Sequence, residues 1–186
     1  MFKADLNKVG LNLSKDACPL VFVCELDIAM DKSLRRSQHR SHLAEMARYS
    51  VIDTLNGLVQ SQTKNLFDEN IESTRQVLKY STTNERFAIL GRKFWGKFLY
   101  RFFDYHLSRE IPNHIGKDRT FSKIEQTAQF KESLRKHCVE TALIVKDFTG
   151  GWPSVTEFRG GITSENVRKG FMPTALKKIT TELARR

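Results

Sequence analysis

The chain has 186 residues, 40% of them hydrophobic and 10% aromatic, a composition that suits a folded globular protein and excludes a disordered one. Its 31 Lys and Arg residues against 21 Asp and Glu residues give a net charge of +10, which favours polyanionic partners, chiefly nucleic acid. The plain alternative is a soluble protein that is basic without having such a partner.

The cysteines and the apolar runs indicate the compartment. The three cysteines are an odd number without a C-x-x-C pair, which argues against a disulfide framework and against a cysteine zinc site. A reducing, cytoplasmic location is therefore the default expectation. The chain has no run of about 18 apolar residues, so we expect no membrane span. The polar residues 1–16 lack the apolar stretch of a secretory signal.

The first predicted element is a β-strand over residues 20–30. Apolar side chains occupy every second position: Leu20, Phe22, Cys24, Leu26, Ile28 and Met30. A shorter alternation at Val9, Leu11 and Leu13 is a candidate hairpin partner. Glu25 and Asp27 would share the opposite face, and their charge excludes this strand from reading a nucleic-acid groove.

A helix over residues 32–60 is predicted next, with Asp31 as its N-cap. Four cations precede its first acidic residue: Lys32, Arg35, Arg36 and Arg40. Cations at a helix N-terminus oppose the macrodipole, so a bound anion would explain the cluster. A solvated basic face is the alternative, and the sequence leaves both interpretations open.

A short helix near residues 69–80 precedes a long helix over residues 82–112, which begins at the T-x-x-E pair Thr82 and Glu85 and ends at Pro112. One arc of this helix is predicted to be core: Phe87, Phe94, Trp95, Phe98, Leu99, Phe102 and Tyr105. A second arc forms what we call the basic ladder: Arg86, Lys93, Lys97 and Arg101. Tyr100 falls beside the ladder, where it suits base stacking or is simply a surface tyrosine.

The last third of the chain is predicted to begin with a helix over residues 122–149 that ends at Gly150. A glycine-rich loop, residues 150–162, contains Arg159 and leads into a helix start. Glycines and first-turn N–H groups suit an anion there, although a plain loop and cap is the favoured interpretation. The C-terminal helix, residues 163–186, is interrupted by Gly170 and Pro173, and Lys177 and Lys178 lie on its basic side.

These elements predict a mainly α fold, a helical bundle of four to five helices with one N-terminal β-strand or hairpin. We expect a single domain, residues 1–186. Its segments are a strand or hairpin segment at 1–31, a helical core at 32–149, the glycine-rich loop at 150–162 and a basic C-terminal helix at 163–186.

The sequence contains no convincing catalytic motif. His137 and Cys138 are adjacent on a predicted helix, hence about 100° apart, and cannot form a nucleophile–base pair with each other. The five histidines lack H-x-x-x-H and H-E-x-x-H spacings. We therefore predict no enzyme activity, no cofactor and no metal. A small Mg²⁺-dependent nuclease using Glu25 and Asp27 is an alternative, although the lysine of a D/E-x-K arrangement is missing.

The function predicted from the sequence is non-catalytic nucleic-acid binding through phosphates, as a regulator or as a subunit of a nucleoprotein complex. DNA and RNA both remain open. The predicted contacts are Lys32, Arg35, Arg36, Arg40, Arg86, Lys93, Lys97, Tyr100, Arg101, Arg159, Lys177 and Lys178. The alternative is a structural subunit whose basic surfaces meet acidic partner proteins. Other protein subunits, or a second copy in a homodimer, are the further partners left open.

Overall fold

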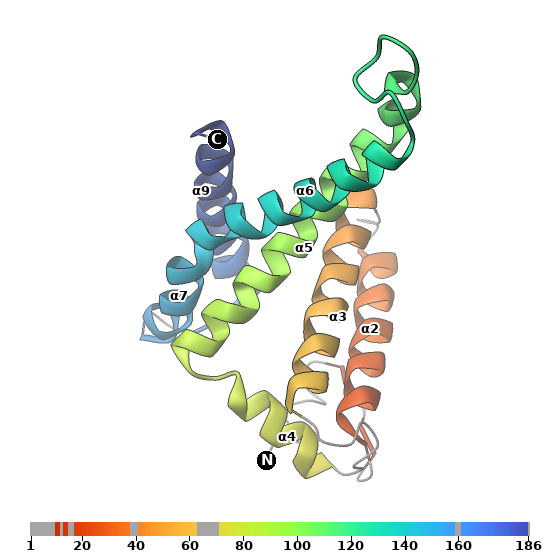
Figure 1. Ribbon diagram of the computed structural model, residues 1–186. Coiled ribbons are helices and arrows are strands. Elements are labelled where there is room, and N and C mark those ends of the chain that lie inside the picture. The colour runs from red at the N-terminus through yellow and green to blue at the C-terminus, as the bar shows by residue number, and fades with distance from the viewer. Residues whose placement is uncertain are drawn as a thin grey trace. The chain divides into compact units, whose positions relative to one another are not determined.

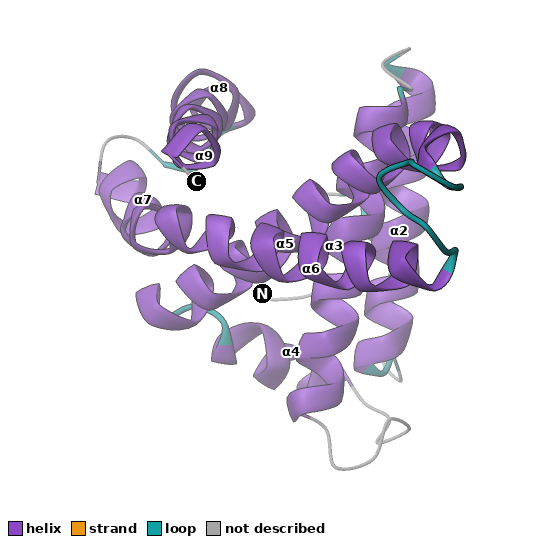
Figure 2. Cartoon of the chain, turned by 45° about the horizontal axis from the view of Figure 1, so that its top comes forward, coloured by secondary structure: helices purple, strands orange, loops and turns teal. Residues whose placement is uncertain are grey.

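A computed structural model describes residues 10–11, 13–14, 17–37, 41–62, 71–158 and 161–185 (Figure 1). These ranges are helical almost throughout and contain no strand, only an isolated bridge between Ile115 and Phe121 (Figure 2). The prediction of a mainly α fold is confirmed. The chain divides into two compact units, Met1–Thr82 (unit 1) and Thr83–Arg186 (unit 2). That the chain forms a single domain stays a prediction.

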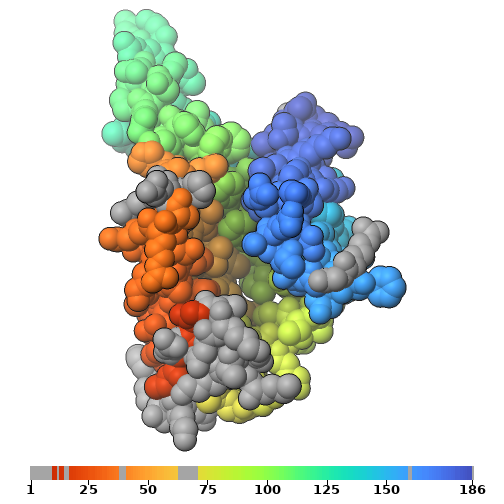
Figure 3. All heavy atoms as spheres, turned by 180° about the vertical axis from the view of Figure 1, so that it is seen from behind, coloured from red at the N-terminus to blue at the C-terminus, as the bar shows by residue number. Residues whose placement is uncertain are grey.

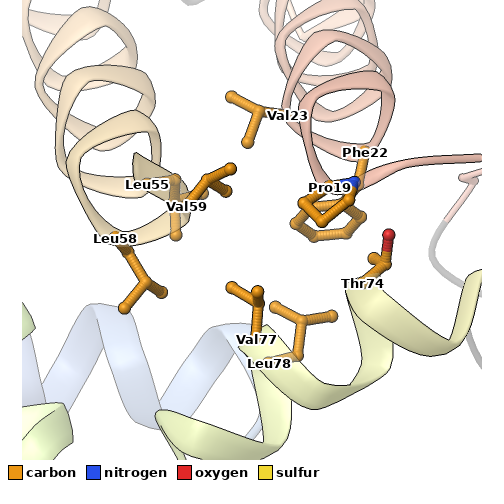
Figure 4. A pocket seen from close by; sticks show the side chains of 9 residues that line it. All are labelled: Pro19, Phe22, Val23, Leu55, Leu58, Val59, Thr74, Val77 and Leu78. Atoms are coloured by element: carbon orange, nitrogen blue, oxygen red, sulfur yellow. The ribbon is translucent and has the colours of Figure 1, made fainter. Parts of the chain in front are cut away.

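Unit 1 contains helices α2 (Pro19–Arg36), α3 (His42–Gln62) and α4 (Ile71–Tyr80). Their apolar side chains converge on a common core (Figure 4), which leaves a void of only about 10 Å³. Two polar contacts join its segments. The Thr74 hydroxyl donates to the Ala17 carbonyl at 3.0 Å, and Arg48 of α3 donates to the Asp27 carboxylate of α2 at 2.5 Å.

The strand predicted over residues 20–30 is wrong, because these residues form most of α2. Pro19 fits the first turn of a helix, where its missing N–H costs nothing. Phe22 and Val23 then follow at i+3 and i+4 and are buried, whereas Leu20 is exposed. The proposed hairpin fails with the strand: Leu11 is buried outside any strand, and Val9 lies outside the described residues.

The helix predicted over residues 32–60 is two helices. Asp31, the predicted N-cap, lies inside α2, and the chain leaves that helix at Ser37. Ser41 caps the following helix instead, since its hydroxyl accepts from the Ala44 N–H at 3.1 Å. The third helix of unit 1, α4, confirms the short helix predicted near residues 69–80.

Unit 2 is organised along α5 (Asn84–Glu110), and α6 (Glu125–Thr141), the 3₁₀ turn η2 (Ala142–Val145) and α7 (Lys146–Phe158) return along it (Figure 1). Lys131 of α6 pairs with Asp104 near the end of α5 at 2.9 Å. The Ser154 hydroxyl of α7 donates to the side chain of Asn84, the first residue of α5, at 2.8 Å. These two contacts fix the antiparallel course.

The aromatic core predicted for the long helix is confirmed at its centre. Trp95 is fully buried, and Phe98 and Leu99 are buried beside it. Phe87, at the first turn, is exposed instead. The predicted N-cap is off by one residue: the Arg86 N–H donates to the Thr83 hydroxyl at 3.4 Å, while the Thr82 hydroxyl donates to a carbonyl of α4.

The helix end predicted at Gly150 is wrong, and so is most of the loop predicted over residues 150–162. Gly150 and Gly151 lie inside α7, which continues to Phe158. Gly150 is buried against α5, so the absence of a side chain serves close helix packing rather than helix termination. Among the residues described after the helix, Gly161 has φ +96°, and its N–H donates to the Thr156 carbonyl at 3.0 Å.

The C-terminal segment is helical as predicted, but its helical turns continue through Gly170 and Pro173 without a break. A short helix α8 (Ser164–Asn166) is capped by Thr163 and passes through the π-helical turn η3 (Val167–Phe171) into α9 (Met172–Arg185). Pro173 lies in the first turn of α9, directly after the π-helical turn. The residues of α7, α8 and α9 form one continuous surface in the space-filling view (Figure 3, blue).

Candidate functional site

Positive charge is concentrated in one of the two units. Unit 2 holds 20 of the 31 Lys and Arg residues and 11 of the 21 Asp and Glu residues, so it carries +9 of the net charge of +10. The remaining 11 cations and 10 acidic residues leave unit 1 at +1. The overall charge therefore belongs to unit 2, which makes that unit the candidate for contacts with a polyanion.

The basic ladder lies on the side of α5 that faces away from its core contacts. Lys97 is nine residues from the buried Ala88, which at about 100° per residue places it on the opposite side of the helix. Lys93 is exposed, and Arg86, Lys97 and Arg101 are half-buried. The structure therefore keeps the predicted ladder together on one helix face, and it spans about 22 Å along the axis.

Tyr100 lies within electrostatic range of Lys131 and Arg135 on α6. The pKa of Lys131 is raised, chiefly by its hydrogen bond to Asp104, and Tyr100 adds to that shift. Arg135 donates to Glu132 at 2.7 Å, a contact that raises the pKa of the guanidinium and lowers that of the carboxyl. Lys131 and Arg135 are both paired with carboxylates. That Tyr100 serves base stacking beside the ladder stays a prediction.

Lys131 and Arg135 are candidate contacts that sequence analysis missed. They lie four residues apart on α6, a spacing visible in the sequence. Their position beside Tyr100 follows only from the antiparallel register of α5 and α6, which the pairing of Lys131 with Asp104 sets. The periodicity of residues within one helix does not predict how α5 and α6 are aligned with each other.

Lys32, Arg35 and Arg36 were predicted to lie at the start of a helix, but they lie near the C-terminal end of α2. Arg35 and Arg36 lie in the last turn of α2, where cations interact favourably with the macrodipole. Arg35 also donates to the Asp31 carboxylate at 2.7 Å. The reason given for an anion at this cluster is therefore wrong. The fourth predicted member, Arg40, lies outside the described residues.

The remaining predicted contacts are near the C-terminus. Lys177 and Lys178 are exposed side chains of α9, whose buried positions are Ala175 and Ile179. These two lysines form a small basic surface on unit 2 that belongs to α9 rather than to α5. Arg159 lies outside the described residues, so its predicted contact is not placed.

The carboxylate pair of the nuclease alternative is not formed. Glu25 and Asp27 are two residues apart on a helix, hence about 200° apart around its axis, rather than on one strand face. Asp27 instead accepts from Arg48, which also donates to Glu45 at 3.0 Å. Across the described part of the chain, no three His, Cys, Asp or Glu side chains gather in a way that could hold a metal ion.

The chain matches no family model, no curated protein and no solved structure. Among the helices that the structure describes, none combines the length and apolar character needed to cross a membrane.

Proposed function

We propose that the chain binds nucleic acid through unit 2, by contacts between its cations and phosphates and without catalysis. The observation that carries this proposal is the charge of +9 on unit 2 against +1 on unit 1. A charge imbalance of this kind attracts polyanions and raises their association rate. It gives affinity without base identity, so we expect little sequence preference.

The spacing of the basic ladder supports phosphate contacts. Lys93, Lys97 and Arg101 follow one another at four-residue intervals, which is about 6 Å per step along the helix axis. That step is comparable with the separation of neighbouring phosphates in a nucleic-acid strand. Because the buried side of α5 packs on α6 and α7, a strand would meet the ladder side.

The surface of α9 supports a second group of contacts. Lys177 and Lys178 are exposed and belong to the same unit as the ladder. The cluster on α2 belongs to the nearly neutral unit and lies at a favourable helix end, so it adds no support. The proposal therefore assigns the interface to α5 and α9.

Charge reversal of the ladder tests the proposal. The variant Lys93→Glu/Lys97→Glu/Arg101→Glu should bind random-sequence DNA and RNA far more weakly than the parent, as measured by fluorescence anisotropy at moderate salt. Neutralising Lys93 alone should lower the magnitude of the slope of log K against log salt by about one. Far-UV circular dichroism checks that each variant keeps its fold, since Lys97 and Arg101 are half-buried.

A matched control separates a local interface from net charge. The variant Lys32→Glu/Arg35→Glu/Arg36→Glu makes the same change of charge on unit 1 and should retain most of the binding. An equal loss in both triple variants would refute the assignment to unit 2. If the parent binds neither DNA nor RNA, the proposal fails, and the structural subunit with acidic protein partners takes its place.

A further inference from the structure

A solvent-open cavity of about 310 Å³ lies between α7 and the C-terminal helical segment of unit 2. Trp152 and Thr156 of α7 form one wall, and Asn166, Lys169 and Gly170 form the other. Its volume falls at the lower end of the range for small-molecule sites. No predicted contact of the ladder or of α9 lines it.

The walls are held by contacts outside the cavity. Trp152 packs on Phe171 with ring centroids 5.0 Å apart, and Phe171 stacks on Phe148 at 5.4 Å. The Asn166 side chain donates to the Gly161 carbonyl at 2.9 Å, and the Gly161 N–H donates to the Thr156 carbonyl at 3.0 Å. The indole and the amide are therefore positioned before any ligand arrives, which reduces the entropic cost of binding.

The backbone of the second wall is unusual. Lys169 and Gly170 belong to the π-helical turn η3, a geometry that occurs mostly as single turns and frequently at functional sites. A side-chain carbon added to Gly170 would meet no atom within 4 Å. The backbone at Gly170 thus lies open beside the lysine.

We propose that this cavity binds a nucleotide unit, with its base against the indole of Trp152 and its phosphate at the ammonium of Lys169. A flat aromatic face beside a cation is the combination that recognises a base and its phosphate. The Thr156 hydroxyl and the Asn166 amide offer polar groups to the base or the sugar. A free nucleoside monophosphate and an unpaired nucleotide of a strand share this chemistry. Only the second source rests on the function proposed above.

Glu165 modulates this site. Its carboxylate pairs with Lys169 at 2.7 Å, and both side chains are 65% exposed. An exposed pair of this kind is weak, so a phosphate can replace the carboxylate at the ammonium. Removing the Glu165 charge should therefore strengthen binding, whereas removing the Lys169 charge should weaken it.

Tryptophan fluorescence provides the assay, because the chain has two tryptophans and Trp95 is fully buried. In a Trp95→Phe background, adenosine and cytidine 5′-monophosphates should quench Trp152. If Trp95→Phe does not fold, isothermal titration calorimetry on the parent chain measures the nucleotide affinity instead. Trp152→Leu should weaken binding about fivefold or more, in line with the loss of a stacked aromatic.

Removing the charge of Lys169 and removing that of Glu165 should change the nucleotide affinity in opposite directions. Lys169→Gln should weaken nucleotide binding about fivefold, and Glu165→Gln should strengthen it. Arg168→Gln is the matched control, since it removes the same charge from the neighbouring exposed position and should leave the affinity unchanged. Equal effects of Lys169→Gln and Arg168→Gln, or binding of inorganic phosphate as tight as that of nucleotide, would overturn the proposal.

Single-stranded oligonucleotides separate this proposal from the proposed function. Quenching by mononucleotides without any strand binding would refute the proposed function and support a free-nucleotide site. Ladder-dependent strand binding that leaves Trp152 fluorescence unchanged, with no mononucleotide binding, would refute the cavity site and support the proposed function. Quenching by single strands but not by duplexes would support an unpaired nucleotide as the ligand.

Discussion

Two adjacent glycines of α7 should respond in opposite ways to the same substitution. A side-chain carbon built on Gly150 lies 2.7 Å from the Asn84 carbonyl oxygen and 2.8 Å from the Ala88 side chain, both on α5. The same carbon on Gly151 meets no atom within 4 Å. Gly150→Ala should therefore destabilise unit 2, and Gly151→Ala should stabilise it.

The expected magnitudes follow from two opposing contributions. Replacing glycine by alanine inside a helix stabilises it by about 0.5–1 kcal/mol, and both variants gain this amount. Gly150→Ala also forces a backbone oxygen and a side-chain carbon away from the new methyl group, and such overpacking costs about 1–3 kcal/mol. The free energy of unfolding should thus differ between the two variants by about 1–3 kcal/mol, independently of helix propensity.

Urea denaturation followed by tryptophan fluorescence measures this difference, because Trp95 and Trp152 both lie in unit 2. The denaturation midpoint should fall for Gly150→Ala and rise for Gly151→Ala, with similar m-values. Ala88→Gly should cost less in the Gly150→Ala background than in the parent, because it removes one of the two close contacts there. Equal stability of the two single variants would refute the close approach of α5 and α7.

Three further predictions concern the cores and the cysteines. Phe98→Ala should cost about 3–5 kcal/mol of unfolding free energy, because Phe98 is buried beside Trp95, and an unchanged melting temperature would contradict that placement. Arg48→Met should cost about 1.5–3 kcal/mol in urea denaturation by removing charged hydrogen bonds, including the one to Asp27. A thiol reagent should modify the exposed Cys24 fast and Cys138 slowly, since burial raises the pKa of Cys138 to about 11. The neutral Cys138 thiol contributes to the free energy of unfolding in full below its unfolded pKa of about 8.5, and the contribution is lost as the pH rises to about 11. In Cys138→Ala, the free energy of unfolding should therefore fall less steeply over this pH range.

Patterns confined to one long helix could be predicted from the sequence. The aromatic arc and the basic ladder of α5 both repeat every three or four residues over several turns, so their separation onto different sides needs no tertiary information. The core positions Trp95 and Phe98 follow from that period alone. The short helix α4 was predicted from the apolar residues Ile71, Val77 and Leu78, and of these only Val77 is fully buried, together with Thr74.

Short apolar runs gave the wrong secondary structure. Residues 20–24 are all apolar, so an alternation of period two and a helical period fit them equally well. Pro19 at a helix start decides in favour of α2, and this shift moves Arg35 and Arg36 from the beginning of one helix to the end of another. An error in one element thus reversed the electrostatic argument for a whole cluster.

The helix end predicted at Gly150 is wrong for a different reason. A glycine after an apolar stripe is typical of a helix end, but a glycine inside a helix also allows a neighbouring backbone to approach closely. The close approach to Asn84 and Ala88 distinguishes these roles, and it joins residues more than 60 positions apart in the sequence. The cavity beside Trp152 was missed with it, because residues 150–158 were expected to be a loop.

The two proposals for unit 2 make separable contributions to strand binding. Contacts of the ladder with phosphates release counterions, so each cation adds to the salt dependence of the binding constant. Stacking on Trp152 involves an uncharged side chain and releases none. Neutralising Lys93, Lys97 and Arg101 together should therefore lower the magnitude of the salt slope by about three, whereas Trp152→Leu should lower the affinity equally at all salt concentrations. A change of slope in Trp152→Leu would show that the indole acts by positioning charged contacts rather than by stacking.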